Sequence, residues 1–228
     1  MWKSLGSLFV SQTCYGCEQA LTSQERFVCL DCLSQIEQTH FHQRPRDNEL
    51  YFRMAGQLPL AGATALFFYD KAGRLQRIMK ALKYQQQPRL GPYLGSLLGE
   101  SLPGSPFLAG IEAIIPVPLH RRKQLQRGYN QSERIARGLS QATGLPVRTD
   151  LLRRRRFTHT QARQAGHARW ENVSGAFLAK GHCPAHVLLL DDMVTTGNTL
   201  IACAQALLAG PTPPQQISVA SIGMARQD

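Results

Sequence analysis

The sequence predicts an α/β fold built on a parallel sheet with flanking helices, with a small four-cysteine module ahead of it. Its 228 residues suffice for one α/β domain and a small appendage. One apolar run, Val187–Leu190, ends in two carboxylates and a threonine-rich turn, as expected of a buried parallel strand that leads into a helix. Two CxxC pairs lie near the N-terminus. We therefore expect a cysteine module in residues 1–36, a linker in 37–60 and the α/β domain in 61–228.

The cysteine module has the spacing of a metal site. Cys14 and Cys17 form one CxxC pair and Cys29 and Cys32 the other, and each pair can place two thiolates on one tetrahedral ion. The intervening Glu18–Val28 is too short and polar to form a core, so metal binding would supply the folding free energy, about 10 kcal/mol or more. A closed, structural zinc site is expected. An iron–sulfur site, a redox disulfide pair and unrelated thiols remain alternatives.

The net charge and the search for targeting signals limit the class of protein. The formal net charge of +11 favours polyanionic partners, nucleic acid first, although it could serve solubility alone. No apolar run approaches the ~18 residues of a membrane-spanning helix. The N-terminal apolar stretch is too short and broken for a signal peptide. We expect a cytoplasmic protein whose cysteines are metal ligands or free thiols.

The first half of the main domain alternates strand and helix patterns. Residues 35–60 are polar and irregular, with room for one short helical piece. Ala63–Tyr69 is a predicted strand. Arg74–Tyr84 has helical spacing, and Lys83 at its end could reach a ligand or belong to a solvated basic face. Pro88–Ser101 is the next predicted helix.

A cationic segment follows the next predicted strand, Ile111–Val117. Asn130 or Ser132 is expected to cap a helix that runs to Ala142. Between strand and helix we expect a loop at the carboxyl end of the strand, where it could bind an anion or simply be solvated. Its cations are Arg121, Arg122, Lys123 and Arg127.

A second basic tract follows the short predicted strand Val147–Leu152. Arg153–Arg156 beside Phe157 could grip a phosphate backbone and stack a base, hold another anionic ligand, or be solvated. The polar segment after it is expected to cover the site as a mobile hood. It carries Gln161, Arg169 and Asn172.

The carboxylates after Val187–Leu190 suit a sugar phosphate. Adjacent ionised Asp191 and Asp192 repel each other, so they suit ribose hydroxyls or a divalent cation. The turn after them leads into a helix N-terminus, which can offer backbone N–H groups to a 5-phosphate. An ordinary turn with a solvated Asp pair is the alternative. The predicted phosphate-binding residues are Thr195, Thr196, Gly197, Asn198 and Thr199.

This stretch resembles the phosphoribosyl pyrophosphate (PRPP) signature of type I phosphoribosyltransferases, and nearly the whole chain resembles the ComF/GntX family of competence-associated proteins. Tyr129 and Met193 are conservative departures from the family pattern. The resemblance rests on the four cysteines, the DD-x-x-TTGNT motif, Leu82-Lys83-Tyr84, Pro116-Val117-Pro118-Leu119, Arg127-Gly128-Tyr129-Asn130-Gln131, and Thr158–Gln161 with Arg169 and Asn172.

The resemblance implies a phosphoribosyltransferase-like domain with a zinc knuckle, and a site for PRPP with Mg²⁺ at Asp191, Asp192 and Thr195–Thr199. The basic loop with Lys83 is then the candidate for the pyrophosphate, and Tyr129, Asn130 and Gln131 join the hood residues near the substrate.

The family also implies a role in natural transformation, in which single-stranded DNA enters the cytoplasm alongside a translocase and a DNA-processing protein. Any membrane association would then be peripheral, through those partners. The sequence leaves open whether the chain only binds PRPP or transfers its phosphoribosyl group to a nucleobase-like or other acceptor.

Overall fold

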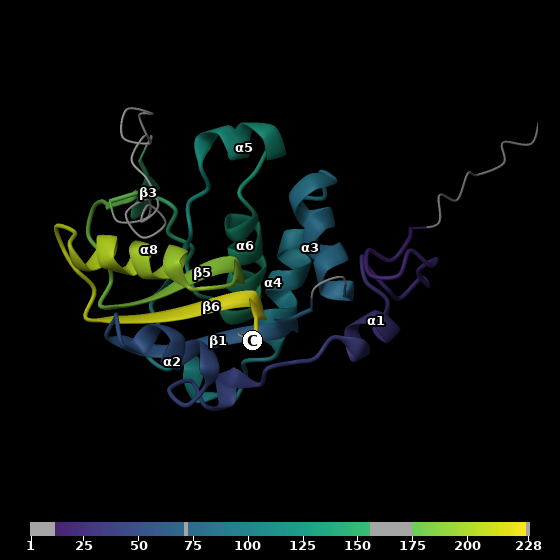
Figure 1. Cartoon of the computed structure of the whole chain (residues 1–228), viewed down its shortest axis with the longest axis horizontal. Helices are drawn as coiled ribbons and strands as arrows, with labels where there is room; N and C mark the ends of the chain where they lie inside the picture. The colour runs from purple at the N-terminus through teal and green to yellow at the C-terminus, as the bar shows by residue number, and fades with distance from the viewer. Residues whose placement is uncertain (1–11, 71–72, 156–174, 227–228) are drawn as a thin grey trace, which may run out of the picture.

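The computed structural model describes residues 12–70, 73–155 and 175–226. Its main sheet has the strand order β1-β6-β5-β2, and every neighbouring pair is parallel (Figure 1). The α/β class with a parallel sheet and flanking helices is therefore confirmed. The strands are β1 (Leu60–Tyr69), β2 (Ala113–Pro116), β5 (His186–Val194) and β6 (Gln216–Ala225), and an antiparallel pair is formed by β3 (Leu152–Arg154) and β4 (Phe177–Ala179).

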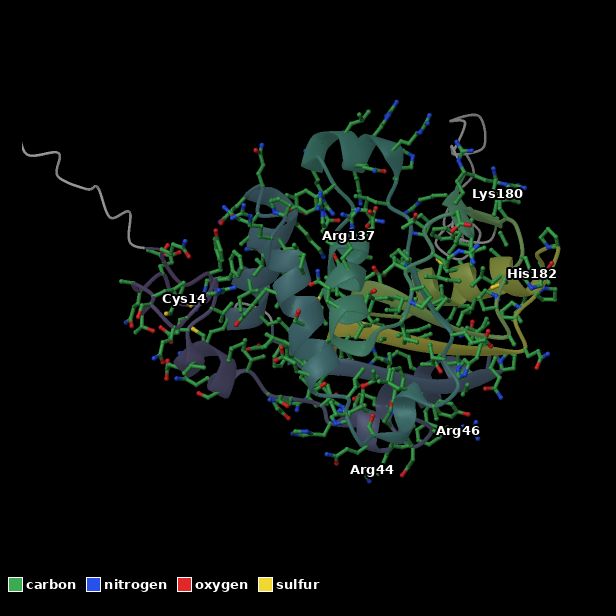
Figure 2. All side chains as sticks on the ribbon, turned by 180° about the vertical axis from the view of Figure 1, so that it is seen from behind. Cys14, Arg44, Arg46, Arg137, Lys180 and His182 are labelled. Carbon is green, nitrogen blue, oxygen red and sulfur yellow. The ribbon has the colours of Figure 1, made fainter. Side chains whose placement is uncertain are left out.

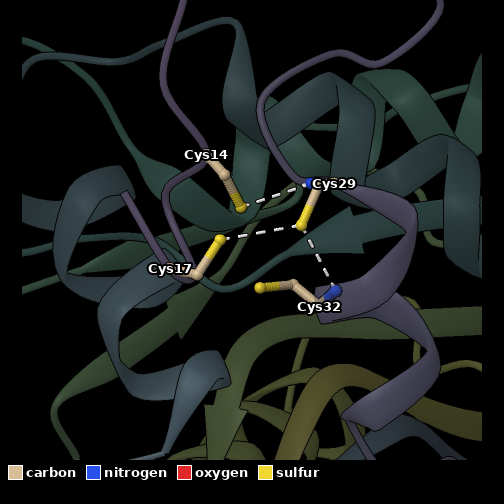
Figure 3. A group of neighbouring side chains, drawn as sticks. All are labelled: Cys14, Cys17, Cys29 and Cys32. Atoms are coloured by element: carbon tan, nitrogen blue, oxygen red, sulfur yellow. Dashed lines mark hydrogen bonds between the residues drawn. The ribbon is translucent and has the colours of Figure 1, made fainter. Parts of the chain in front are cut away.

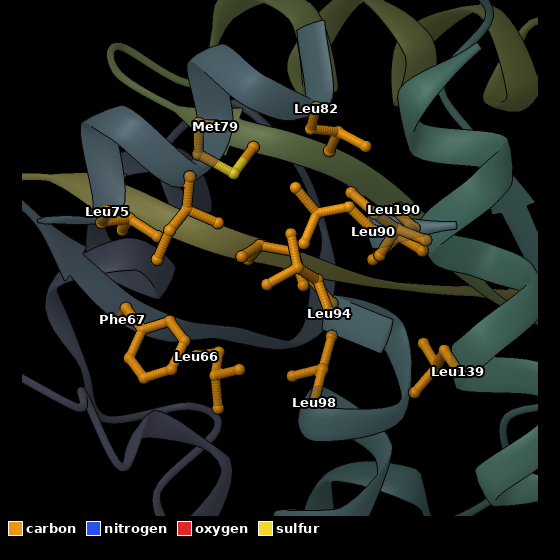
Figure 4. Packing of buried hydrophobic residues seen from close by; sticks show 14 of the residues in the cluster. Leu66, Phe67, Leu75, Met79, Leu82, Leu90, Leu94, Leu98, Leu139 and Leu190 are labelled. Atoms are coloured by element: carbon orange, nitrogen blue, oxygen red, sulfur yellow. The ribbon is translucent and has the colours of Figure 1, made fainter. Parts of the chain in front are cut away.

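Helices bury both faces of the main sheet. Along β5, Leu188 and Leu190 pack into the cluster formed with α3 (Arg74–Tyr84), α4 (Leu90–Glu100) and α6 (Gln131–Thr143) (Figure 4). Val187 and Leu189 pack into the cluster formed with α2 (Glu49–Ala55) and α8 (Asn198–Leu208). Alternate residues of a strand point to opposite faces, so an unbroken apolar run fits a strand covered on both sides.

The helical spacing predicted for residues 74–84 is confirmed in α3. Its apolar stripe, Leu75, Ile78, Met79 and Leu82, is buried against the sheet. At α6, the Asn130 side chain accepts a hydrogen bond from the Ser132 N–H at 3.1 Å and caps the helix.

Small residues let α4 and α6 approach closely. Gly91, Gly95 and Gly99 recur at four-residue spacing on α4. A Cβ on Gly95 would lie 2.0 Å from the Ile135 carbonyl oxygen, and a Cβ on Gly138 of α6 would lie 1.9 Å from the Pro92 carbonyl oxygen. Only glycine fits at these two contacts, so the glycines set the position of α6 over the sheet.

The segment predicted as a linker packs onto the sheet. Residues 41–43 form a 3-10 turn, and α2 follows, capped by the Asn48 side chain. Leu50 and Met54 of α2 are fully buried. The Phe68 N–H donates to the Glu37 carbonyl at 2.9 Å. One turn of helix separates Leu50 from Met54, and this spacing turns both side chains inward.

Three segments differ from the prediction. Residues 121–127, predicted as a loop, form the helix α5 (Arg121–Arg127). His120 accepts from the Arg122 N–H at its start, and Gly128, with φ of 79°, ends it. Strand β5 continues through the two acids to Val194, because β6 runs alongside it as far as Met224 and supplies hydrogen-bond partners. Of the predicted strand at 147–152, only Val147 forms a bridge, to Ile114, before β3 begins.

The cysteine module docks on the α3 and α4 side of the domain, with α1 (Leu30–Gln35) at its end. Cys14, Val28 and Cys32 belong to the same buried cluster as Leu94. The Phe27 ring lies 5.5 Å from the Tyr93 ring of α4, centroid to centroid. The module therefore shares a core with the sheet.

Among the helices of the described ranges, none combines the length and the apolar character needed to cross a membrane.

We predict that Gly95→Ala destabilises the fold by about 2 kcal/mol or more, because separating two packed helices costs more than the ~1 kcal/mol that alanine gains in a helix. The measurement is urea unfolding followed by circular dichroism. Gly56→Ala is the control: a Cβ there meets nothing within 4 Å and the backbone is helical. Equal stability of the two variants would contradict the close-approach argument.

Candidate functional site

Two carboxylates at the end of β5 form the centre of the site. The Asp191 carboxylate accepts a hydrogen bond from the Ser132 hydroxyl at 3.0 Å and from the Asp192 N–H at 2.8 Å. The Asp192 carboxylate lies 3.0 Å from the Lys83 ammonium group. Ser132 begins α6 and Lys83 lies in the last turn of α3. Neighbours on a regular strand point to opposite faces, yet both carboxylates contact helices of the same layer.

The carboxylate pair is electrostatically strained. Burial, together with the charge of Asp192, raises the pKa of Asp191 to about 7, from an ordinary value of 3.8. The folded state thus holds a proton that the unfolded chain would release. The contribution of this group to stability is complete at acidic pH and is lost as the pH rises through about 7. A bound cation or a set of hydroxyl donors would relieve the strain.

The turn after the acids leaves a helix N-terminus open. Gly197 has φ of 83° and is the N-cap of α8, and as a glycine it has no side chain to cap the first turn of that helix. Thr195 and Thr196 are exposed, while Asn198 and Thr199 are half-buried. The free N–H groups and the positive end of the helix dipole point out of the turn, and such an arrangement binds anions.

Arg53 of α2 holds this turn in place through hydrogen bonds to backbone carbonyls. Its guanidinium donates to the carbonyl of Thr195 and, at 3.0 Å, to the carbonyl of Ala225 at the end of β6. Glu49 accepts from the same guanidinium at 2.5 Å. Sequence reasoning missed Arg53, because it lies in the segment predicted as a linker. The signal that could have found it was Asn48-Glu49, a helix start, followed by Leu50 and Met54.

The Arg-Gly-Tyr-Asn-Gln segment is mostly internal. The Tyr129 hydroxyl donates to the Leu82 carbonyl, and the Asn130 amide donates to the Val117 carbonyl at 3.0 Å. Gln131 is 1% exposed and accepts from Arg127 at 2.9 Å. These residues hold the turn between α5 and α6, and so they place Ser132 against Asp191.

The structure divides the predicted basic residues into groups. Lys83 lies at the acids. Arg127 lies over the Tyr84 ring, 5.1 Å from its centroid. Arg121 lines a separate cavity that it shares with the arginines of β3. Arg122 and Lys123 are exposed on α5. The hood residues Gln161, Arg169 and Asn172 lie outside the described residues.

A cavity of about 900 Å³ lies away from the acids, between the cysteine module and α4. Tyr15, Phe27 and Tyr93 line it. It contains none of the residues predicted for the site, and its size therefore does not identify it as the functional centre.

The four cysteines converge as a metal site requires (Figure 3). Their sulfur atoms all lie within 4.8 Å of one another, and Cys17 and Cys29 are 3.7 Å apart, sulfur to sulfur. A tetrahedral zinc ion with Zn–S bonds of about 2.3 Å holds its sulfurs about 3.8 Å apart, whereas a disulfide needs about 2.05 Å. The donor set fits a structural metal such as zinc.

Backbone donors prepare the thiols for a cation. Burial opposes ionisation of Cys14, but N–H donors that include those of Cys29, at 3.2 Å, and Gly16, at 3.3 Å, outweigh it and lower the pKa of Cys14 to about 7. Burial and the neighbouring thiols raise the pKa of Cys32. Ionising all four thiols therefore needs a bound cation.

We predict one zinc equivalent per chain and loss of that zinc in Cys17→Ser, measured by elemental analysis of the purified protein. Cys203→Ser, which alters a buried thiol of α8, is the control and should retain the metal. An iron–sulfur absorbance band, or a thiol count showing two disulfides, would contradict the assignment.

Parts of this chain are similar to known proteins. Competence protein F of Haemophilus influenzae is 39% identical over 93 residues, which are 39% of this chain and 41% of that protein. DNA utilization protein YhgH of Escherichia coli O157:H7 is 29% identical over 152 residues, 65% of this chain and 67% of that protein, and YhgH of Shigella flexneri is equally similar. The matched region thus spans about two fifths of Competence protein F and two thirds of YhgH. No family model matches the chain. The names of these relatives support the resemblance of this chain to the ComF family of competence-associated proteins.

Proposed function

We propose that this chain binds PRPP with Mg²⁺ and supports the uptake of single-stranded DNA into the cytoplasm. One observation carries the PRPP proposal. Asp191 and Asp192 stand at the carboxyl end of a buried parallel strand, and the N-terminus of α8, whose N-cap Gly197 has no side chain, follows directly. Ligands of open α/β sheets bind at this edge. We propose further that the domain has the type I phosphoribosyltransferase fold.

The carboxylates and the turn suit the two halves of a ribose 5-phosphate. Asp191 and Asp192 would accept from the ribose hydroxyls, which would offset the burial and the repulsion from Asp192 that raise the pKa of Asp191. The 5-phosphate would accept from the N–H groups at the start of α8 and from the hydroxyls of the turn. The phosphate-binding residues would be Thr195, Thr196, Gly197, Asn198 and Thr199.

Lys83 and the cations of α5 suit the diphosphate. Lys83 already lies 3.0 Å from Asp192, at the edge of the carboxylates. Arg127 lies over Tyr84, the residue after Lys83. Mg²⁺ on the diphosphate would neutralise part of its charge and orient it. Arg121, Arg122 and Lys123 complete the proposed set of cations.

The role in DNA uptake rests on the relatives and on the charge. Two relatives carry the names Competence protein F and DNA utilization protein. A net charge of +11 suits a phosphate backbone. We propose that the chain acts in the cytoplasm, next to a translocase that delivers the strand and a DNA-processing protein that receives it, with any membrane association made through those partners.

An active phosphoribosyltransferase is the second candidate. Displacing pyrophosphate from the ribose needs positioning and electrostatics more than a dedicated nucleophile. The pKa of Asp191, raised to about 7, favours this candidate, since such a carboxyl can accept a proton from an incoming acceptor near neutral pH. The acceptor would be nucleobase-like, or another nucleophile.

The test is calorimetric titration with Mg²⁺ and PRPP. Asp191→Asn combined with Asp192→Asn should weaken binding about 100-fold or more, because it removes charge-assisted hydrogen bonds worth about 1.5–3 kcal/mol each. Asp47→Asn combined with Asp150→Asn removes the same charge at exposed positions and should retain the wild-type affinity. Unchanged affinity in the first variant, or no binding by the wild type, would overturn the proposal.

A further inference from the structure

A cationic groove of about 500 Å³ lies between α5 and the β3–β4 pair. Figure 1 shows β3 and α5 projecting from the same end of the molecule. In Figure 2, Lys180 lies at this end, whereas Arg44 and Arg46 lie at the opposite one. Five cations line the groove: Arg121, Arg153, Arg154, Arg155 and Lys180.

Within residues 12–70, 73–155 and 175–226, carboxylates do not balance the charges of this groove. None of its five cations lies within ion-pair distance of a carboxylate in the part of the chain that the structure describes. Glu133 also lines the groove, but it is already paired with Arg137 at 2.7 Å. Like charges gathered in one hollow repel one another, and a polyanion would relieve that repulsion.

The arginines of β3 are arranged along an extended backbone. Arg153 and Arg155 are exposed. The Arg155 N–H donates to the Ala176 carbonyl at 2.8 Å, which continues the β3–β4 ladder beyond Arg154. Residues two apart on a strand lie on the same face, about 6.7 Å from each other. Arg154 lies over the Phe177 ring, 5.3 Å from its centroid, and is half-buried. The result is a pair of exposed arginines, Arg153 and Arg155, with Arg154 between them held over the buried Phe177 ring.

The groove and the carboxylates share a wall. Pro116 and Asn130 line the groove. Pro116 pairs with Leu190, the residue before Asp191. Asn130 caps α6 by accepting from the Ser132 N–H, and Ser132 donates to Asp191. A ligand in the groove would therefore lie next to the carboxylates, and it would share Arg121 with the proposed set of diphosphate cations.

We infer that this groove binds the phosphate backbone of a single nucleic-acid strand and leads it to the edge of the carboxylate site. The inference rests on the proposed function, since it names where the strand of that function binds. A linear row of cations suits a repeating chain of phosphodiesters. A diphosphate is one compact group and does not need such a row. Lys83, which lies 3.0 Å from the Asp192 carboxylate, is better placed to bind it.

The experiment measures fluorescence anisotropy of a labelled oligodeoxythymidine against salt, with Arg153→Gln combined with Arg155→Gln as the test variant. Binding should weaken at least tenfold at low salt. The slope of log affinity against log salt should become shallower by about 1.4, because each arginine on a single strand contributes about 0.7. Arg44→Gln combined with Arg77→Gln removes the same charge elsewhere and should leave affinity and slope near the wild type.

Calorimetry with Mg²⁺ and PRPP on the same variants separates the possible ligands. Retained PRPP affinity together with lost strand affinity supports the groove assignment. Lost PRPP affinity with retained strand affinity would assign the groove to the diphosphate and overturn the inference, and so would unchanged strand binding. If Asp191→Asn combined with Asp192→Asn keeps PRPP affinity while the groove variant loses the strand, the proposed PRPP function fails and the groove assignment stands.

Discussion

Repulsion between two neighbouring carboxylates at the end of β5 is the constraint around which this molecule is organised. Asp191 and Asp192 cannot be separated along the chain, and burial strengthens the repulsion between them. The Ser132 hydroxyl and the Lys83 ammonium group each contact one of them. What these contacts do not offset appears as the raised pKa of Asp191. A ligand that carries hydroxyl groups, together with a divalent cation, would reduce the repulsion that remains between the two carboxylates.

Much of the fold serves to bring those two partners into place. Helix α3 positions Lys83, because the apolar stripe of that helix packs on the sheet. Ser132 arrives through α6, whose position depends on the glycine contact with α4. On the other face, α2 carries Arg53 to the carbonyl of Thr195 and so holds the turn that follows the acids. The carboxylates therefore depend on both layers of helices.

The sequence was informative wherever a local pattern decided the structure. The apolar stripe of α3, the buried strand before Asp191 and the convergence of the CxxC pairs all follow from spacing. It failed where tertiary contacts decided. One short helical piece was expected in residues 35–60, but their polar composition gave no sign that α2 packs onto the sheet through the buried Leu50 and Met54. A run of cations suggested a loop, yet His120 and Gly128 provide caps for α5. Sequence alone also could not divide the basic residues, because Lys83, Arg127 and Arg121 separate only in three dimensions.

The two proposed anion-binding regions thus meet at one edge of the sheet, and they differ in geometry. The turn before α8 is a compact cradle of backbone N–H groups, whereas β3 and α5 enclose a longer cationic groove. The shared wall at Asn130 links them through Ser132 to Asp191. In the proposed function, the nucleic-acid strand and the sugar phosphate would therefore lie side by side.

Hydrogen–deuterium exchange with and without Mg²⁺ and PRPP tests the central claim most directly. We expect slower exchange at the amides of residues 197–200, because a bound 5-phosphate would accept hydrogen bonds from them. The amides of residues 153–155 should keep their rates. No slowing at the start of α8, or slowing confined to the groove, would contradict the assignment of the β5 carboxylates and their turn as the PRPP site.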